Sequence, residues 1–270
     1  MPDDANKTKG YHHLRPSYFS SQQYDAQLEY RHNLLKDHLP ERPTRVLEIG
    51  CGQGTTTDAL ARLVLSHSPH GHIDALDPAP LSQVFSLEKH TYQSDGCSPF
   101  TLGQAQAYLT SPGYGFPELI TFHQADPVQF LLAEDERNKN KKWDVAVLVH
   151  SVWYFRDVDS LAEILQSLKG RVKRVLIAEF ALHATVKEAL PHVFAAIARG
   201  TLEGLKLERG VESSTENMRC LVSPEGIKQV ARETGWKLER EGVVVPEIEL
   251  GDGDWETNSV VGEGFEREIE

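Results

Sequence analysis

The sequence predicts an α/β protein with a doubly wound, mostly parallel seven-stranded sheet and helices on both faces. Short apolar runs alternate with helical patterns through residues 45–180, as they do where helices connect buried parallel strands. A glycine-rich turn at residues 50–54 joins the first apolar run to the next helical pattern. Polar side chains follow several of these runs, at the sheet edge where α/β proteins bind their ligands.

The elements follow from hydrophobic spacing and from breaker residues. The first helix is expected to stop before Pro40, and a later helix is expected to start at Ser223-Pro224, a favourable N-cap and first position. The expected strands are residues 45–49, 73–76, 119–123, 143–149, 172–180, 236–245 and 255–261. The expected helices are residues 20–39, 55–65, 82–89, 102–109, 128–134, 159–168, 186–200 and 224–235.

This order suggests how the chain is divided. Residues 1–40 are expected to form an N-terminal arm and lid helix, and residues 41–270 the main domain. Two long segments interrupt the strand and helix alternation, at about 90–117 and 181–221. We expect both to be cap insertions over a binding site.

Composition narrows the function. The formal net charge is −12, which disfavours a nucleic acid partner because phosphate binding needs a basic surface. Three cysteines without CxxC spacing predict neither a zinc site nor a disulfide framework. No apolar run approaches membrane-spanning length, and the N-terminus lacks the apolar core of a signal peptide. We therefore expect a cytoplasmic protein that does not bind membranes.

The glycine turn distinguishes between nucleotide ligands. Gly50, Gly52 and Gly54 form G-x-G-x-G, and Thr55 precludes the third glycine of the G-x-G-x-x-G dinucleotide fingerprint at its usual spacing. No Lys-Ser/Thr pair follows, so the turn is not a phosphate-binding P-loop.

Residues 46–54, Val-Leu-Glu-Ile-Gly-Cys-Gly-Gln-Gly, resemble the first motif of class I S-adenosylmethionine (SAM)-dependent methyltransferases. The resemblance covers about residues 45–180. It implies that Glu48, two residues before Gly50, lies near the methionine ammonium of SAM. It also implies that Gly50, Cys51, Gly52 and Gly54 pass along the carboxypropyl and ribose groups. A carboxylate beside the cationic ligand is electrostatically favourable.

The same resemblance implies further cofactor contacts at later strand ends. Asp77, followed by Pro78, matches the acid that binds the ribose hydroxyls, and a carboxylate suits two such hydroxyls because it accepts two hydrogen bonds. Ala125 and Asp126 match the adenine contact, and His150 and Ser151 follow the fourth strand near the cofactor. Structural alternatives are a salt bridge for Glu48 and a helix N-cap for Asp126. Asp74 competes with Asp77 but falls inside its strand.

Candidate residues for catalysis and acceptor binding follow the fourth and fifth strands. His150 is the first candidate base, because imidazole accepts a proton near neutral pH, and His183 is the second. Trp153 and Tyr154 are expected to contact the acceptor, although an aromatic cluster at a strand end is often only core. Tyr11 and Tyr18 are expected to act from the lid. No paired Asp-Asn follows these strands, so no catalytic metal is predicted.

These observations predict a methyltransferase that uses SAM to methylate a nitrogen or oxygen of a small, partly hydrophobic molecule. The lid and the insertions make the chain similar to methyltransferases of fungal secondary metabolism. Alternatives are a SAM-binding protein without turnover, an NAD(P)-dependent oxidoreductase, and a nucleic acid or protein methyltransferase. Either a monomer or a homodimer is compatible with the sequence.

Overall fold

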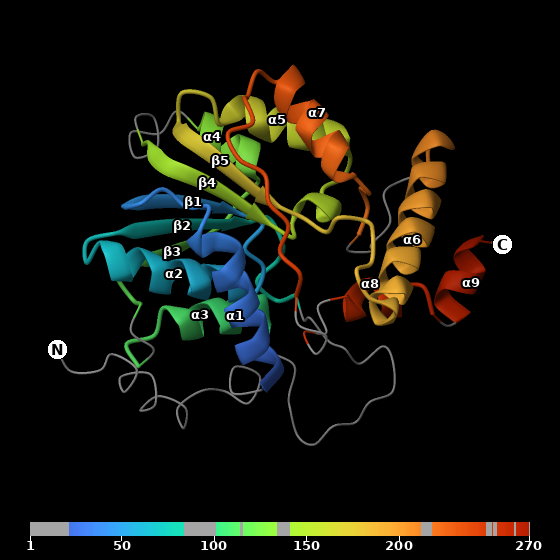
Figure 1. The fold of residues 1–270 in the computed structure, drawn as a ribbon, viewed down its shortest axis with the longest axis horizontal. Helices are drawn as coiled ribbons and strands as arrows, with labels where there is room; N and C mark the ends of the chain where they lie inside the picture. Colours follow the sequence, from blue (N-terminus) through green and yellow to red (C-terminus); the bar gives the residue numbers. More distant parts are fainter. Residues whose placement is uncertain are drawn as a thin grey trace. The chain divides into compact units, whose positions relative to one another are not determined.

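The computed structural model describes residues 22–83, 101–113, 116–133, 141–211, 218–246, 250, 253–261 and 263–269. It divides into two compact units, residues 1–125 and 126–270. Each unit combines parallel strands with helices (Figure 1), so the predicted α/β class with a parallel sheet is confirmed. The expected division into an N-terminal arm, a main domain and cap insertions stays a prediction.

Unit 1 contains three parallel strands, in the spatial order β3-β2-β1. They are β1 (Arg45–Ile49), β2 (His72–Asp77) and β3 (Ile120–Gln124). Ile49 of β1 pairs with Leu76 of β2, so these two strands end together. The apolar side chains of β1 and β2 are buried on both faces, which is why these runs are continuous rather than alternating.

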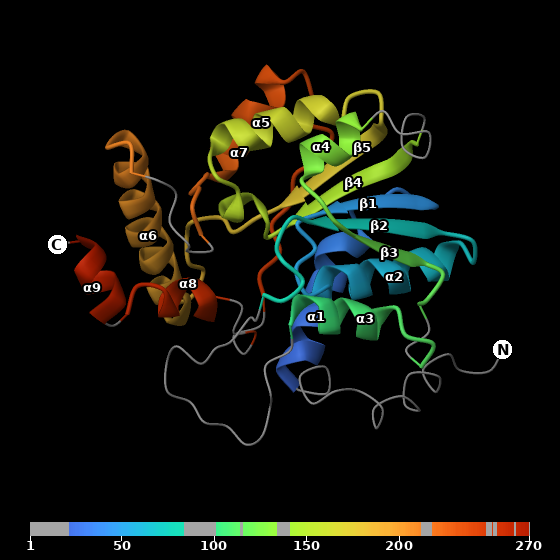
Figure 2. The same cartoon turned by 180° about the vertical axis from the view of Figure 1, so that it is seen from behind.

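Three helices pack in unit 1: α1 (Gln22–Lys36), α2 (Thr55–His67) and α3 (Leu102–Leu109). Figure 2 shows α2 and α3 on the same side of β2 and β3. Helix α1 packs on α2, and the buried Tyr24 hydroxyl donates to the Asp58 carboxylate at 2.8 Å. Helix α3 begins with a capping box in which Thr101 and Gln104 bond reciprocally. The first contact holds α1 against α2, and the capping box fixes the start of α3.

Unit 2 is built on two parallel strands, β4 (Trp143–Val149) and β5 (Val172–Ala178). Helices α4 (Pro127–Leu132), α5 (Val158–Ser167) and α7 (Pro224–Glu233) lie on one side of them (Figure 1). Helix α7 starts at Ser223, whose hydroxyl accepts from the Gly226 N–H at 3.1 Å, as the sequence predicted. The Trp236 indole donates to the Leu165 carbonyl at 3.0 Å and ties α7 to α5.

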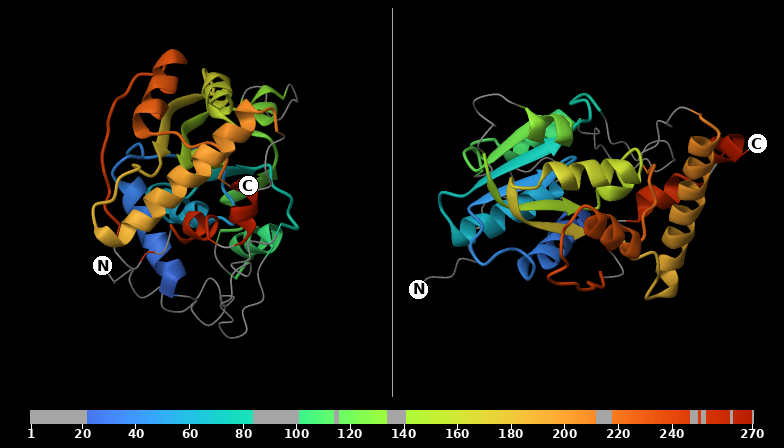
Figure 3. Two further views of the ribbon diagram at one scale, coloured as in Figure 1. Left: turned by 90° about the vertical axis from the view of Figure 1, so that its right-hand side faces the viewer. Right: turned by 90° about the horizontal axis from the view of Figure 1, so that it is seen from above.

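Three further helices form one end of unit 2 (Figure 3): α6 (Leu190–Glu208), α8 (Asp254–Asn258) and α9 (Glu263–Ile269). The Arg199 side chain on α6 is buried and joins all three. Its guanidinium donates to both carboxylate oxygens of Glu268 on α9, at 2.7 and 3.2 Å. It also donates at 2.7 Å to the carbonyl of Ser259, just beyond α8. A bidentate, charge-assisted pair of this kind orients two helices at once.

The prediction of seven strands was wrong, because five strands form within the described residues. Residues 236–245 make no ladder, and Leu238, Val243 and Val245 are exposed, so no strand or core among the described residues covers them. The other expected strand is largely helical: α8 begins where Thr257 bonds back to the Gly253 carbonyl at 3.1 Å. No helix in the described parts of the chain is long and apolar enough to cross a membrane.

Candidate functional site

The glycine turn connects β1 to α2 and is held by the end of β2. The N–H groups of Gly50 and Cys51 both donate to the Leu76 carbonyl, at 2.9 and 3.0 Å. Gly54 is the N-cap of α2 and has φ +96°, which L side chains rarely adopt. A Cβ on Gly54 would also collide with the Leu109 side chain of α3, whereas a Cβ on Gly52 would meet nothing within 4 Å. The turn is therefore packed from behind at Gly54 and open at Gly52.

Asp77, at the end of β2, locks the turn in place. One carboxylate oxygen accepts from the Gly52 N–H at 2.8 Å, and the other accepts from the Ala79 N–H at 2.9 Å. Each carboxylate oxygen can accept a second hydrogen bond. Asp77 is partly buried, so the carboxylate is oriented by the protein and keeps capacity for hydroxyl donors.

Glu48 lies behind the turn, 1% exposed. Its carboxylate accepts from the Thr57 hydroxyl of α2 at 2.6 Å. Burial raises the pKa of Glu48 to about 8; the bond from Thr57 and the charge of Arg31 oppose this rise, and the charge of Asp77 adds to it. The side chain is thus mostly neutral at pH 7 in the folded protein without a ligand.

Gln106 on α3 is a contact to the turn that the sequence analysis missed. Its amide donates to the Gly52 carbonyl at 3.0 Å, and it lies 3.9 Å from the Cys51 sulfur. A buried amide needs such a partner, and an amide among the apolar residues Leu102, Ala105 and Leu109 is the signal that could have identified it. Burial also raises the pKa of the Cys51 thiol well above its usual value.

The remaining cofactor candidates near this edge differ in exposure. Ala125 follows β3, and its N–H donates to the Asp77 carbonyl at 3.1 Å; Pro78 is exposed. Asp126, also exposed, caps α4 by accepting from the Gln129 N–H at 2.9 Å, as the structural alternative proposed. Asp74, the competitor of Asp77, is buried and lies 2.9 Å from the His123 imidazole.

His150 stands at the end of β4 in a left-handed conformation, with φ +48°. A non-glycine residue there is strained, which often marks a functional site. Its Nδ1 lies 3.3 Å from a Glu179 carboxylate oxygen, and both side chains are largely buried. Glu179 also accepts from the N–H groups of Val152 and Phe180, at 3.0 and 3.1 Å. The carboxylate is therefore fixed, and it orients the imidazole.

The other candidates in unit 2 separate into buried and exposed groups. Trp153 is 2% exposed, and its indole donates to the Val222 carbonyl at 3.0 Å, so it is part of the core. Ser151 is equally buried, and its hydroxyl makes no hydrogen bond within the described residues. His183 is exposed, with Nδ1 3.3 Å from the Ala181 carbonyl. Tyr11 and Tyr18 lie outside the described residues.

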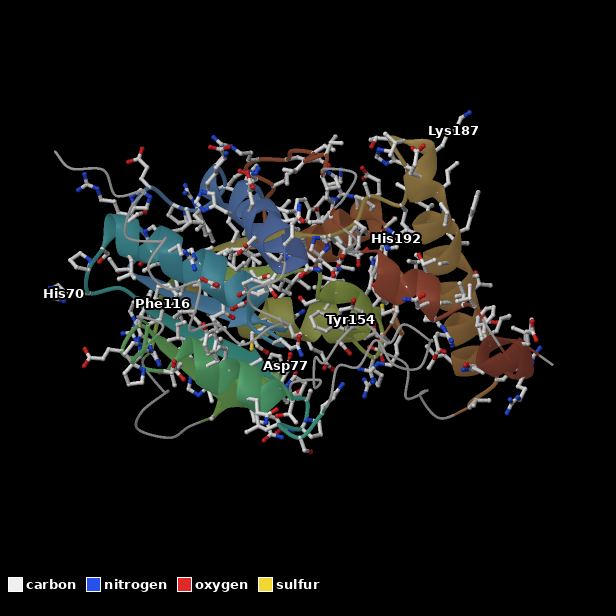
Figure 4. The ribbon with its side chains drawn as sticks, turned by 90° about the horizontal axis from the view of Figure 1, so that it is seen from below. His70, Asp77, Phe116, Tyr154, Lys187 and His192 are labelled. Carbon is white, nitrogen blue, oxygen red and sulfur yellow. The ribbon has the colours of Figure 1, made fainter. Side chains whose placement is uncertain are left out.

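Tyr154 leads to two residues that sequence reasoning did not identify. Its hydroxyl donates at 3.0 Å to Glu256 of α8, a carboxylate that is 2% exposed. The second Glu256 oxygen lies 3.3 Å from Nε2 of His192, near the start of α6. Figure 4 labels both residues: Tyr154 ends the short 3-10 helix Val152–Tyr154 after β4, and His192 belongs to α6. More than a hundred residues separate Tyr154 from Glu256 in the chain, so no local motif signals the contact.

These observations show whether the residues of the site fit SAM. The open space at Gly52, the oriented Asp77 carboxylate and the buried carboxyl of Glu48 fit a ligand with vicinal hydroxyls and positive charge. Among the described residues, no three His, Cys, Asp or Glu side chains group as a metal site. Fold and site together define a parallel α/β protein with a glycine turn after β1. Asp77 bonds to this turn, and Glu48 bonds to the helix that follows it.

The comparisons give the family. The methyltransferase domain family matches residues 18–241, and the chain belongs to it. It is 28% identical over 255 residues to two proteins of Diaporthe leptostromiformis, methyltransferase phomM and methyltransferase phomM′. The match covers 84% of this chain and 62% of each relative. The chain thus spans less than two thirds of the length of the curated relatives it matches.

A solved structure shows the same fold. The cyclopropane-fatty-acyl-phospholipid synthase-like protein of Lactobacillus casei superposes with a TM-score of 0.69 at 24% identity. The superposition covers 94% of this chain and 86% of that protein. At this identity the likeness shows the fold alone and does not indicate a substrate.

Proposed function

We propose that this methyltransferase uses SAM to methylate a nitrogen or oxygen atom of a small, partly hydrophobic molecule. The observation that carries the proposal is the bond from Gly52 to Asp77, backed by the buried Glu48. This arrangement offers an open backbone turn beside a fixed hydroxyl acceptor. It matches the first motif of the family at the residues where that motif requires glycine and acid.

Each acid has a distinct task toward SAM in this proposal. Asp77 would hold the two ribose hydroxyls with the acceptor capacity left on its oxygens. Glu48 would lie near the ammonium, and Gly50, Cys51, Gly52 and Gly54 would follow the carboxypropyl and ribose groups. A nearby cation favours the ionised carboxylate, so SAM binding at pH 7 should release a proton from Glu48.

Further contacts rest on the sequence pattern. Pro78 is assigned beside the ribose, Ala125 and Asp126 beside the adenine, and His150 and Ser151 to the cofactor side after β4. Asp126 already caps α4 with one oxygen; its other oxygen is the one assigned to the ligand. The buried Ser151 hydroxyl, which makes no hydrogen bond within the described residues, has capacity for a polar ligand atom.

His150 is the proposed base. Bound SAM would supply an electrophilic methyl group on a sulfonium, and the protein contributes alignment, water exclusion and proton transfer. His150 would take the proton of an acceptor O–H or N–H, and Glu179, 3.3 Å from Nδ1, would orient the ring and stabilise the imidazolium. The exposed His183 is the second candidate.

The acceptor side of the proposal combines described and sequence-based residues. Tyr154 and Trp153 are the acceptor contacts after β4, with Trp153 as a rigid wall because its indole is already bonded. Tyr11 and Tyr18 are proposed to complete the site from the N-terminal lid. The acidic composition supports a small-molecule partner rather than nucleic acid or membrane. Cytoplasmic action as a monomer or homodimer and a place in fungal secondary metabolism remain parts of the proposal.

Titration calorimetry of the full chain tests the cofactor assignment. SAM and S-adenosylhomocysteine should bind, and NAD(H) should not. Asp77→Asn should weaken SAM at least tenfold, because one oxygen becomes a donor facing ribose hydroxyls. Asp37→Ala, which removes an exposed carboxylate of the same unit, should leave the affinity unchanged. NAD(H) binding without SAM binding would overturn the proposal.

Turnover separates the enzyme from a SAM-binding protein without activity. Incubation with SAM and a panel of small phenols and amines should give products one methyl group heavier by mass spectrometry. His150→Gln should lower kcat by about 10²-fold or more, the usual contribution of a positioned base. His183→Gln tests the second candidate base in the same way, and His67→Gln, which changes an exposed imidazole of unit 1 with no assigned role, is the matched control.

A further inference from the structure

His192 and Glu256 form a buried polar pair whose hydrogen bonding is incomplete. Nε2 of His192 and one Glu256 oxygen lie 3.3 Å apart. Neither atom makes a hydrogen bond within the described residues, although both are inaccessible to solvent. Buried polar atoms in native proteins are nearly always satisfied. Besides each other, both atoms can therefore take a further partner that the described residues do not supply.

The protein holds this pair in place from two sides. The other Glu256 oxygen accepts from the Tyr154 hydroxyl at 3.0 Å. His192 lies at the start of α6, where its ring meets Phe180 edge-on, with centroids 4.6 Å apart. Arg199 bonds the chain just after α8 to α6, so the helices that carry the two residues are fixed together.

The surroundings of the pair are aromatic. Trp153 lies 5.4 Å from Phe180 and 6.2 Å from His192 between ring centroids. Another neighbour of Phe180 is His150, with centroids 4.1 Å apart. The two imidazoles therefore both contact the Phe180 ring. Aromatic walls with a few fixed polar groups are typical of sites for flat, partly apolar ligands.

The chemistry of the two atoms defines the missing partner. A carboxylate oxygen only accepts, and a neutral imidazole Nε2 carrying its proton donates. A hydroxyl satisfies both, because it donates to the carboxylate and accepts from the imidazole. An ether or a methyl group on the same ring could not donate to Glu256.

We propose that His192 and Glu256 bind a hydroxyl group of the methyl acceptor and that the acceptor is a hydroxylated aromatic compound whose ring packs against Phe180 and Trp153. This inference rests on the proposed function, because it names the acceptor class of that reaction. His192 and Glu256 act as binding residues, and Tyr154 positions Glu256.

The test compares two ring-matched probes, 2-naphthol and 2-methoxynaphthalene, which differ in the ability to donate a hydrogen bond. Binding to the full chain is measured by titration calorimetry without any adenosyl compound. The wild-type protein should prefer 2-naphthol at least tenfold. Glu256→Gln and His192→Gln should each remove most of that preference and change 2-methoxynaphthalene binding less than threefold.

Two control variants and a folding measurement make the result decisive. Glu188→Gln and Lys187→Gln alter exposed charged side chains in the same part of unit 2, and both should retain the preference. Thermal unfolding identifies a variant that does not fold; His192→Gln, at a residue that keeps some exposure, then carries the test.

Equal affinity of the wild type for the two probes, including no binding of either, would overturn the proposal. So would a folded Glu256→Gln or His192→Gln protein that keeps the full preference. SAM calorimetry on the same preparation separates the outcomes: hydroxyl preference without SAM binding refutes the proposed function and leaves this site standing. SAM binding without the preference does the reverse.

Discussion

Glu48→Gln is a sharp test of the electrostatics behind the glycine turn. The carboxyl group is 1% exposed and accepts a 2.6 Å hydrogen bond from Thr57. Glutamine has nearly the same shape and its carbonyl can accept the same bond, but it cannot ionise. The substitution therefore removes the ionisable carboxyl group at position 48 and leaves the packing in place.

The magnitude follows from the pKa. Burial raises the pKa of Glu48 from an ordinary value of 4.5 to about 8. Because the folded state holds this proton more tightly than the unfolded state, the stabilising effect is fully present below pH 4.5. It is lost as the pH rises to about 8. At 1.36 kcal/mol per unit, the loss between pH 5 and pH 8 is about 3 to 4 kcal/mol.

Equilibrium urea unfolding of both proteins at pH 5, 6, 7 and 8 measures this loss. We expect Glu48→Gln and wild type to be similar at pH 5, with the variant gaining on the wild type by roughly 1 kcal/mol per pH unit above pH 5. Glu118→Gln, at an exposed position of the same unit, should run parallel to wild type. A Glu48→Gln difference that stays constant from pH 5 to pH 8 would refute a raised pKa for Glu48.

Two other predictions concern packing around the same turn. Gly54→Ala should lower the free energy of unfolding by at least 2 kcal/mol more than Gly52→Ala, because both have positive φ and only Gly54 faces Leu109; equal urea midpoints would contradict this. Cys51 and Cys220, whose thiol pKa values burial raises, should react with iodoacetamide at pH 8 at least tenfold more slowly in the folded than in the urea-unfolded protein. Peptide mapping that shows equal rates would refute the reasoning.

Elements with a strong local signal were predicted closely. Strands β1 and β4 and helix α3 have the expected bounds, because each is a continuous apolar run or helical pattern between clear breakers. The two wrong strands lie where the signal was weakest. Residues 236–245 contain β-branched side chains, but a strand needs a neighbour to pair with, and none is present in the described structure.

The residues of the candidate site also differ in whether a local sequence pattern could identify them. Glu48, Gly50, Gly52, Gly54 and Asp77 could be identified from spacing, because a turn after a strand and an acid after the next strand are both local patterns. Gln106, His192 and Glu256 could not. Their partners lie 54 to 102 residues away in the chain or on helices whose packing no local pattern reveals.

The sequence by itself determined the α/β class, the glycine turn and the acids beside it, because periodicity and turn chemistry are properties of short segments. Only the tertiary structure decided the states of those residues. It buried Glu48 and so raised its pKa, and it oriented Asp77 with two backbone N–H groups. It also brought Tyr154, His192 and Glu256 together. Burial and long-range contact depend on how distant segments pack, which no local pattern of residues contains.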